Sequence, residues 1–265
     1  MRTITKISTQ KKSANRYNIF LDHEYAFSVD EDVLIKFHLH KGLTLSDEMI
    51  KNITENESLQ RSYLSAINYV SYRMRSMLEM RTYLKGKEME ETAIDQVIDR
   101  LVLEKVLNDE EFANAYVKDR MNFTSKGPTL IAKELQEKGV SFEIANRAAL
   151  QYSEEQQFAK AIKWAEREFN KKSKHSYRKR QEQLTYKLLQ KGFTNDVVTD
   201  VMREVSREKD HEEEKSVLQV QGDKLVRRYS KKFSGYELKT KIKAGLYSRG
   251  FSSELINEYV ENLEE

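Results

Sequence analysis

The sequence is distinctive first in what it lacks. Its 265 residues include no cysteine and a single proline, Pro128. Without cysteine there is no disulfide, thiolate nucleophile or cysteine-bound metal. No apolar stretch approaches the roughly 18 residues of a membrane span, and the amino terminus has no signal-peptide pattern. We therefore expect a soluble, cytoplasmic protein without a membrane partner.

Catalytic motifs are also missing from the sequence. The five histidines are scattered, and the one close pair, His38 and His40, has no third ligand at a metal-binding spacing. There is no glycine-rich phosphate loop. The acidic run 109–111 is explained by the preference for acids in the first turn of a helix. The sequence thus predicts no enzyme, no cofactor and no metal.

Charge and a repeated phrase are what the chain has in abundance. Charged residues make up 34% of it and apolar residues 38%, which favours thin helical modules over one thick core. A basic residue, glycine, an apolar residue and Ser or Thr follow one another at 138–141, 191–194 and 249–252, with a degenerate copy at 87–90. Counted from the second position, the copies are 51, 53 and 58 residues apart. Repeats of this size predict stacked units that present a surface.

Each copy of this repeat phrase is predicted to end one helix and begin the next. The basic residue suits the carboxyl end of a helix, and glycine suits the left-handed position just beyond it. Ser141, Thr194 and Ser252 are then the expected N-caps of the following helices. Glu88 stands where the other copies have glycine, which leaves the tight turn of the first copy in question.

Further helix starts complete a three-helix unit. Capping-box patterns begin at Ser76, Ser153 and Ser234, and Gly127-Pro128 places proline at a first helical position. The predicted fold is mainly α: an elongated array of helix-turn-helix-like three-helix repeats. Repeats 1 to 4 are expected at 59–107, 108–152, 153–207 and 208–265.

Residues 1–58 do not follow the repeat. Polar and apolar residues alternate at 4–7, 17–21 and 25–29, and 22–24 has the composition of a hairpin turn. A short helix is expected over 30–37 and a return strand at 42–45. The first 58 residues are therefore predicted to form a small β-rich domain in front of the repeats.

Positive charge gathers in the last two repeats. Residues 167–191 contain nine basic and two acidic residues, and 224–249 contain nine basic and one acidic residue. Both segments centre on the junction between the first two helices of a repeat, so the two could align. We call the following residues the basic stripe: Lys171, Lys172, Lys174, Arg178, Lys179, Arg180, Arg227, Arg228, Lys231, Lys232, Lys239, Lys241 and Lys243.

The basic stripe is interpreted as a contact surface for a polyanion. Lysine and arginine neutralise phosphates, and aromatic faces can stack on bases. Tyr177, Tyr229, Phe233 and Tyr236 lie among the basic residues. The alternative is a solvated charged face whose aromatics belong to the core, and for Phe233 and Tyr236 we expect core packing.

Three stretches resemble the RecX family of regulatory proteins. They are 72–84, then 106–120 with its sequence VLNDEEFANAYVKDR, and 126–140 with its Lys-Gly-Pro and Lys-Gly-Val. Repeats 3 and 4 match by repeat pattern only, and Glu88 and Asn108 depart from the usual family residues.

The resemblance implies a non-catalytic regulator that binds the RecA nucleoprotein filament and modulates strand exchange and ATP hydrolysis by RecA. On this hypothesis the basic stripe faces DNA or the filament interior, and repeats 1 and 2 bind RecA. Tyr116, Lys118 and Arg120 are the candidate RecA contacts, although Tyr116 has helical spacing from Phe112 and could be core. The protein is expected to be a monomer that binds DNA alone more weakly. Two alternatives are a direct DNA-binding protein with tandem helix-turn-helix units and a helical-repeat protein scaffold.

Overall fold

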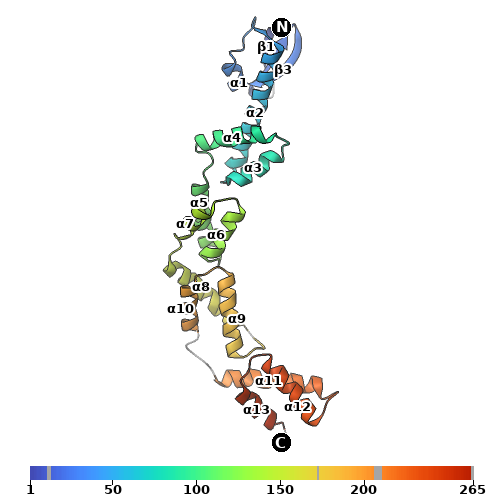
Figure 1. Ribbon diagram of the computed structural model, residues 1–265, viewed down its shortest axis with the longest axis vertical. Helices are drawn as coiled ribbons and strands as arrows, with labels where there is room; N and C mark the ends of the chain where they lie inside the picture. Colours follow the sequence, from blue (N-terminus) through green and yellow to red (C-terminus); the bar gives the residue numbers. More distant parts are fainter. Residues whose placement is uncertain (11–12, 172, 206–210, 264–265) are drawn as a thin grey trace. The chain divides into compact units, whose positions relative to one another are not determined.

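The computed structural model describes residues 1–10, 13–171, 173–205 and 211–263 (Figure 1). Lys172 of the basic stripe lies outside the described residues. In the described part of the chain there are four strands and thirteen helices, so the predicted mainly helical fold with a β-rich start is confirmed. The chain divides into two compact units, Met1–Phe112 with Lys138–Val140, and Ala113–Glu137 with Ser141–Glu265. None of the helices in these described ranges is both long and apolar enough to cross a membrane.

The amino-terminal domain is a four-stranded antiparallel sheet with strand order β3-β2-β1-β4. Its elements are β1 (Arg2–Gln10), β2 (Ser13–Leu21), β3 (Glu24–Asp30), α1 (Glu31–Lys36) and β4 (Thr44–Leu45). The predicted hairpin turn is present, with Asp22 and His23 at φ 51° and 74°. The predicted return strand β4 pairs with β1. Alternate residues such as Ile4, Ile19 and Val29 are buried in the core beneath the sheet.

Each of the four repeats consists of three helices, named a, b and c. In chain order they are α2 (Asp47–Ser71), α3 (Met77–Lys85) and α4 (Glu91–Leu103); α5 (Asp109–Phe123), α6 (Pro128–Glu137) and α7 (Phe142–Ala149); α8 (Glu154–Phe169), α9 (Tyr177–Gln190) and α10 (Asn195–Val205); α11 (His211–Tyr229), α12 (Gly235–Tyr247) and α13 (Ser253–Glu261). Repeats 1, 3 and 4 each enclose a separate apolar cluster. The apolar residue of the repeat phrase, Phe193 or Phe251, is part of that cluster in repeats 3 and 4.

Helix α2 joins the amino-terminal domain to repeat 1 without a break. It runs continuously through position 58, where the sequence suggested a boundary. Its buried Glu57 accepts from the Arg16 guanidinium at 2.7 Å and from the Asp30 backbone N–H at 2.6 Å. Gln60, one turn further on, donates to Asp32 at 2.7 Å. One helix therefore holds the sheet on its first half and belongs to repeat 1 on its second half.

Most of the predicted helix caps are confirmed. The Ser76, Ser141 and Ser252 hydroxyls accept from backbone N–H groups three residues on, and Ser153 forms the full capping box. Ser176 caps α9 in the same way. The capping box predicted at Ser234 is wrong, because its side chain makes no cap hydrogen bond. There Ser234 is extended at φ −138° and Gly235 follows at φ +51°, which turns the first backbone N–H groups away from the hydroxyl.

The turn inside the repeat phrase has the predicted left-handed backbone. Gly139, Gly192 and Gly250 have φ values of 84°, 83° and 85°. Glu88 takes the same conformation at φ 59° although it carries a side chain. The tight turn is thus present in all four copies, and in the first it is made by a residue for which it is strained.

Candidate nucleic-acid and protein interface

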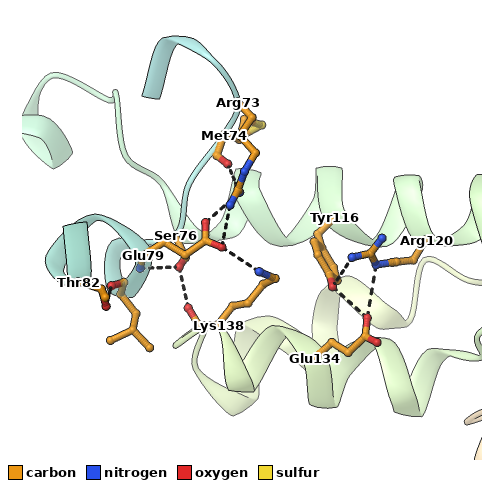
Figure 2. Close-up of polar contacts among 10 residues, drawn as sticks. Arg73, Met74, Ser76, Glu79, Thr82, Tyr116, Arg120, Glu134 and Lys138 are labelled. Carbon is orange, nitrogen blue, oxygen red and sulfur yellow. Dashed lines mark hydrogen bonds and ion pairs between the residues drawn. The ribbon is translucent and has the colours of Figure 1, made fainter. Parts of the chain in front are cut away.

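The repeat phrase also seats the beginning of helix b from the preceding repeat, in a contact that we call a joint. In the first joint, the Ser76 hydroxyl donates to the Lys138 carbonyl at 2.6 Å (Figure 2). The Lys138 ammonium contacts the Glu79 carboxylate at 2.8 Å. A Cβ added to Gly139 would lie 2.4 Å from the Leu78 Cβ, so only glycine allows this approach.

Glu79 is the charged centre of the first joint. The Arg73 guanidinium binds both of its carboxylate oxygens, at 3.0 and 3.1 Å, and Lys138 binds it from the other side (Figure 2). Burial opposes ionisation of this carboxyl, but the hydrogen bonds and charges of Arg73 and Lys138 outweigh it and lower its pKa to about 2. The joint is therefore held by an ionised glutamate at any pH near neutrality.

In the second joint, unlike the other two, a Cβ added to the glycine of the phrase would meet backbone atoms. Gly127 N–H donates to the Lys191 carbonyl at 2.7 Å, and Thr129 N–H donates to the Gly192 carbonyl at 3.1 Å. A Cβ on Gly127 would lie 2.3 Å from Gly192 backbone atoms, and a Cβ on Gly192 would lie 2.3 Å from the Leu130 nitrogen. Gly127 is thus more than a helix-start signal, because the contact between repeats 2 and 3 requires it.

The third joint repeats the same chemistry. Ser176 N–H donates to the Arg249 carbonyl at 3.0 Å. A Cβ on Gly250 would lie 2.8 Å from the Ser176 hydroxyl and 2.9 Å from the Lys179 Cβ. In all three joints the residue before helix b donates to the carbonyl of the basic residue of the phrase. The recurring pairing of a basic residue with glycine was the sequence signal for this contact, but sequence reasoning assigned it to helix capping alone.

The three candidate RecA contacts lie on α5 and differ in their surroundings. Tyr116 donates to Glu134 at 2.9 Å, and Arg120 donates to the Tyr116 hydroxyl at 2.8 Å (Figure 2). Burial raises the pKa of the Tyr116 hydroxyl, while Lys126 and the hydrogen bond from Tyr116 help to hold the pKa of Glu134 below its usual range against the effect of burial. Tyr116 and Arg120 are half-buried in this network, whereas Lys118 is exposed.

Repeat 3 neutralises much of its own part of the basic stripe. Lys171 pairs with Glu168, and Lys187 reaches the same carboxylate at 2.5 Å. Arg178 and Lys179 both pair with Glu182, at 3.2 and 3.5 Å. Arg180 donates to the Phe169 carbonyl and lies 4.4 Å from the centre of its ring. Lys174 is exposed beside half-buried His175, whose pKa is lowered by burial and by the charges of Lys174, Arg249 and Lys179.

Most of the basic-stripe residues of repeat 4 have no acidic partner among the described residues. Within the described residues, no ion pair involves Arg227, Arg228, Lys231, Lys232, Lys241 or Lys243. Lys239 and Lys243 are half-buried, and the others are exposed. Lys241 lies 5.5 Å from the ring centre of half-buried Phe233. The expected core packing of Tyr236 is wrong, since this side chain is 87% exposed at the start of α12.

The parts of the basic stripe in repeats 3 and 4, called here the clusters of repeats 3 and 4, lie near opposite ends of α12. The cluster of repeat 3 reaches Gly250, just beyond the end of α12, through Lys179. The cluster of repeat 4 lies before the start of the same helix, at Lys231 and Lys232. A helix of 13 residues is about 20 Å long. Lys239, Lys241 and Lys243 lie along this helix, so α12 is the element that connects the two clusters.

Family comparisons cover almost the whole chain. The model described as "Regulatory protein RecX N-terminal domain" matches residues 2–46. Models of the first and second three-helix domains of RecX match 63–101 and 108–148. The model of the third matches twice, at 154–202 and at 212–260, so repeats 3 and 4 are two copies of one domain type.

Individual relatives agree with the family models. The chain is 43% identical over 266 residues to "Regulatory protein RecX" of Oceanobacillus iheyensis, covering 98% of both chains. It is 40% identical over 264 residues to the protein of that name from Halalkalibacterium halodurans, covering 98% of this chain and 99% of the relative.

Solved structures show the same similarity. "Crystal structure of regulatory protein RecX" superposes with a TM-score of 0.70 at 31% identity, over 77% of this chain and 100% of that one. "Crystal structure of RecX from Lactobacillus salivarius" superposes with a TM-score of 0.53 at 33% identity, over 56% of this chain and 96% of that one. Sequence and structure lead to one assignment: the chain belongs to the RecX family of regulatory proteins.

Proposed function

We propose that the protein binds the RecA filament on DNA with two different surfaces, DNA against repeats 3 and 4 and RecA against repeats 1 and 2. As a member of the RecX family it is a regulator of RecA, and it performs no catalysis itself. Its action is proposed to lie in the cytoplasm, in DNA repair, recombination and the SOS response, with the protein acting as a monomer.

The observation that carries the DNA contact is the unpaired charge of repeat 4. Exposed arginine and lysine side chains around the start of α12 have no acidic partner among the described residues, and Tyr236 projects beside them. Such cations bind phosphates with release of counterions, and an exposed aromatic ring can stack on an unpaired base. The corresponding residues of repeat 3 already hold Glu168 and Glu182, so we expect them to contribute less.

The proposed RecA contact rests on the exposed face of α5. Lys118 is exposed. The hydrogen bond from Tyr116 to Glu134 and the one from Arg120 to the Tyr116 hydroxyl hold the helix that carries it. In this arrangement Tyr116 and Arg120 position Lys118 and contribute less to direct contact.

The test compares two charge reversals of equal size. Arg227→Glu/Lys231→Glu removes cations from repeat 4, and Arg2→Glu/Lys41→Glu removes exposed cations from the amino-terminal domain. Inhibition or stimulation of RecA ATPase and strand exchange is measured for both, together with binding to DNA-bound RecA at several salt concentrations. We expect the repeat 4 variant alone to lose effect and to bind with a salt slope lowered by about 0.7–0.9 per lost phosphate contact.

Other outcomes favour the alternatives. Unchanged binding of the repeat 4 variant to DNA-bound RecA would favour a scaffold that recognises protein only. Tight binding of the unmodified protein to bare DNA, with the same affinity when RecA is present, would favour a direct DNA-binding protein.

A further inference from the structure

The three joints share one pattern, and this pattern leaves one helix start and one repeat phrase without a partner. Each joint needs the first turn of a helix b on one side and a repeat phrase with glycine on the other. Three joints use helices α3, α6 and α9 and the phrases of repeats 2, 3 and 4. The first turn of α12 and the phrase of repeat 1 are therefore left without a joint partner in the described part of the chain.

The unused first turn of α12 has the side chains of the first joint. Ser234, Tyr236 and Glu237 occupy the positions of Ser76, Leu78 and Glu79. All three are exposed, and a Cβ added to Gly235 would meet nothing within 4 Å. The side chains of this turn therefore suit the same partner as those of α3: a basic residue for the glutamate and a glycine for the side chain at position 236. The backbone differs at Gly235, which has φ +51°, so docking would require this turn to take the conformation of the first turn of α3.

The unused phrase of repeat 1 has the backbone conformation of a joint, but the Glu88 side chain occupies the place of a docked helix. Lys87 and Glu88 are exposed, and Glu88 has the left-handed conformation of the other three phrases. At the equivalent glycines, a Cβ alone would come within 2.3 to 2.8 Å of the docked helix. Glu88 carries this atom and a charged side chain beyond it, so no helix can dock there.

We propose that the Glu88 side chain prevents a second copy of the chain from docking on the phrase of repeat 1. Without this side chain, residues 234–237 of one molecule would dock on the phrase at 87–89 of another, with Glu237 against Lys87 as Glu79 lies against Lys138. Such a contact joins different surfaces of identical chains, so it would continue from copy to copy instead of ending in a dimer. A non-glycine residue in a strained turn is consistent with a role other than local stability.

The experiment removes the side chain with Glu88→Gly. This substitution also relieves the backbone strain, so the variant is expected to fold. Sedimentation velocity over a wide concentration range should show at least a tenfold larger oligomer fraction than the unmodified protein at its highest concentration. Glu88→Ala is the matched control, because it keeps the Cβ and should sediment as the unmodified protein does. Glu88→Gly/Glu237→Lys should also remain unassociated, because it places two cations opposite each other.

A second variant completes the phrase by adding Met89→Phe and Glu90→Ser to Glu88→Gly. If neither glycine variant associates, the proposal is overturned. It is also overturned if Glu88→Ala associates equally, or if Glu237→Lys leaves the association unchanged.

Discussion

Replacing Gly192 with alanine tests the joints most directly, because a Cβ at this position meets backbone atoms. The new atom would lie 2.3 Å from the Leu130 nitrogen and 2.5 Å from the Leu130 Cβ. Neither can move without moving α6. The joint would open, and its two backbone hydrogen bonds, from Gly127 and Thr129, would be lost.

The expected loss of stability has two parts. Alanine at φ +83° costs about 1–2 kcal/mol in any surroundings. Two lost hydrogen bonds add about 1 kcal/mol each, so the free energy of unfolding should fall by about 3–4 kcal/mol. Gly42→Ala is the matched control, since Gly42 has φ +92° and an added Cβ meets nothing within 4 Å. It should show the first part only.

Urea denaturation followed by circular dichroism measures both variants, and hydrogen exchange locates the change. In Gly192→Ala the amides of Gly127 and Thr129 should exchange faster, because their acceptors lie across the joint. Equal losses of stability for the two variants, with the Gly127 amide still protected, would refute the reasoning.

Three further predictions concern charged groups. Glu79 has a folded-state pKa lowered to about 2, so its contribution to stability is complete at pH values above its ordinary pKa and is lost as the pH falls toward 2. Glu79→Gln should therefore flatten the acid limb of a stability–pH profile. Glu57→Ala leaves Arg16 without its buried partner and should destabilise the amino-terminal domain by about 3 kcal/mol, seen as early proteolysis of residues 1–46 while the repeats stay folded. Glu168→Gln removes the partner of Lys171 and should strengthen DNA binding several-fold at low salt, whereas no change in affinity would show that repeat 3 lies away from DNA.

Local sequence signals predicted the repeats well because they act over a single turn of chain. Serine hydroxyls reach backbone N–H groups three residues away, and glycine accepts a left-handed backbone wherever it stands. Ser234 shows the limit of this reasoning. Its pattern matches a capping box, but the conformation of Gly235 removes the hydrogen bond.

Composition predicted where the basic residues of the candidate interface lie, and contacts in the folded protein decide which of them remain available. The excess of basic residues in repeats 3 and 4 is a property of the sequence, and both segments read alike. The fold brings Lys187 to Glu168, 19 positions away in the chain, whereas Arg227, Arg228, Lys231 and Lys232 have no acidic partner in the part of the chain that the structure describes. Which charges remain available is decided by such contacts, and they cannot be counted from composition.

The sequence by itself determined the number of repeats, their order and the turn that ends the middle helix of repeats 2, 3 and 4, because helical period, caps and glycine are local properties. Tertiary structure alone decided what each phrase touches. The same glycine that ends a helix also admits the helix of the preceding repeat, since only a residue without Cβ lets two backbones come so close. That second role depends on residues roughly 60 positions away, such as Ser76 and Lys138, and no periodicity in the chain encodes their distance.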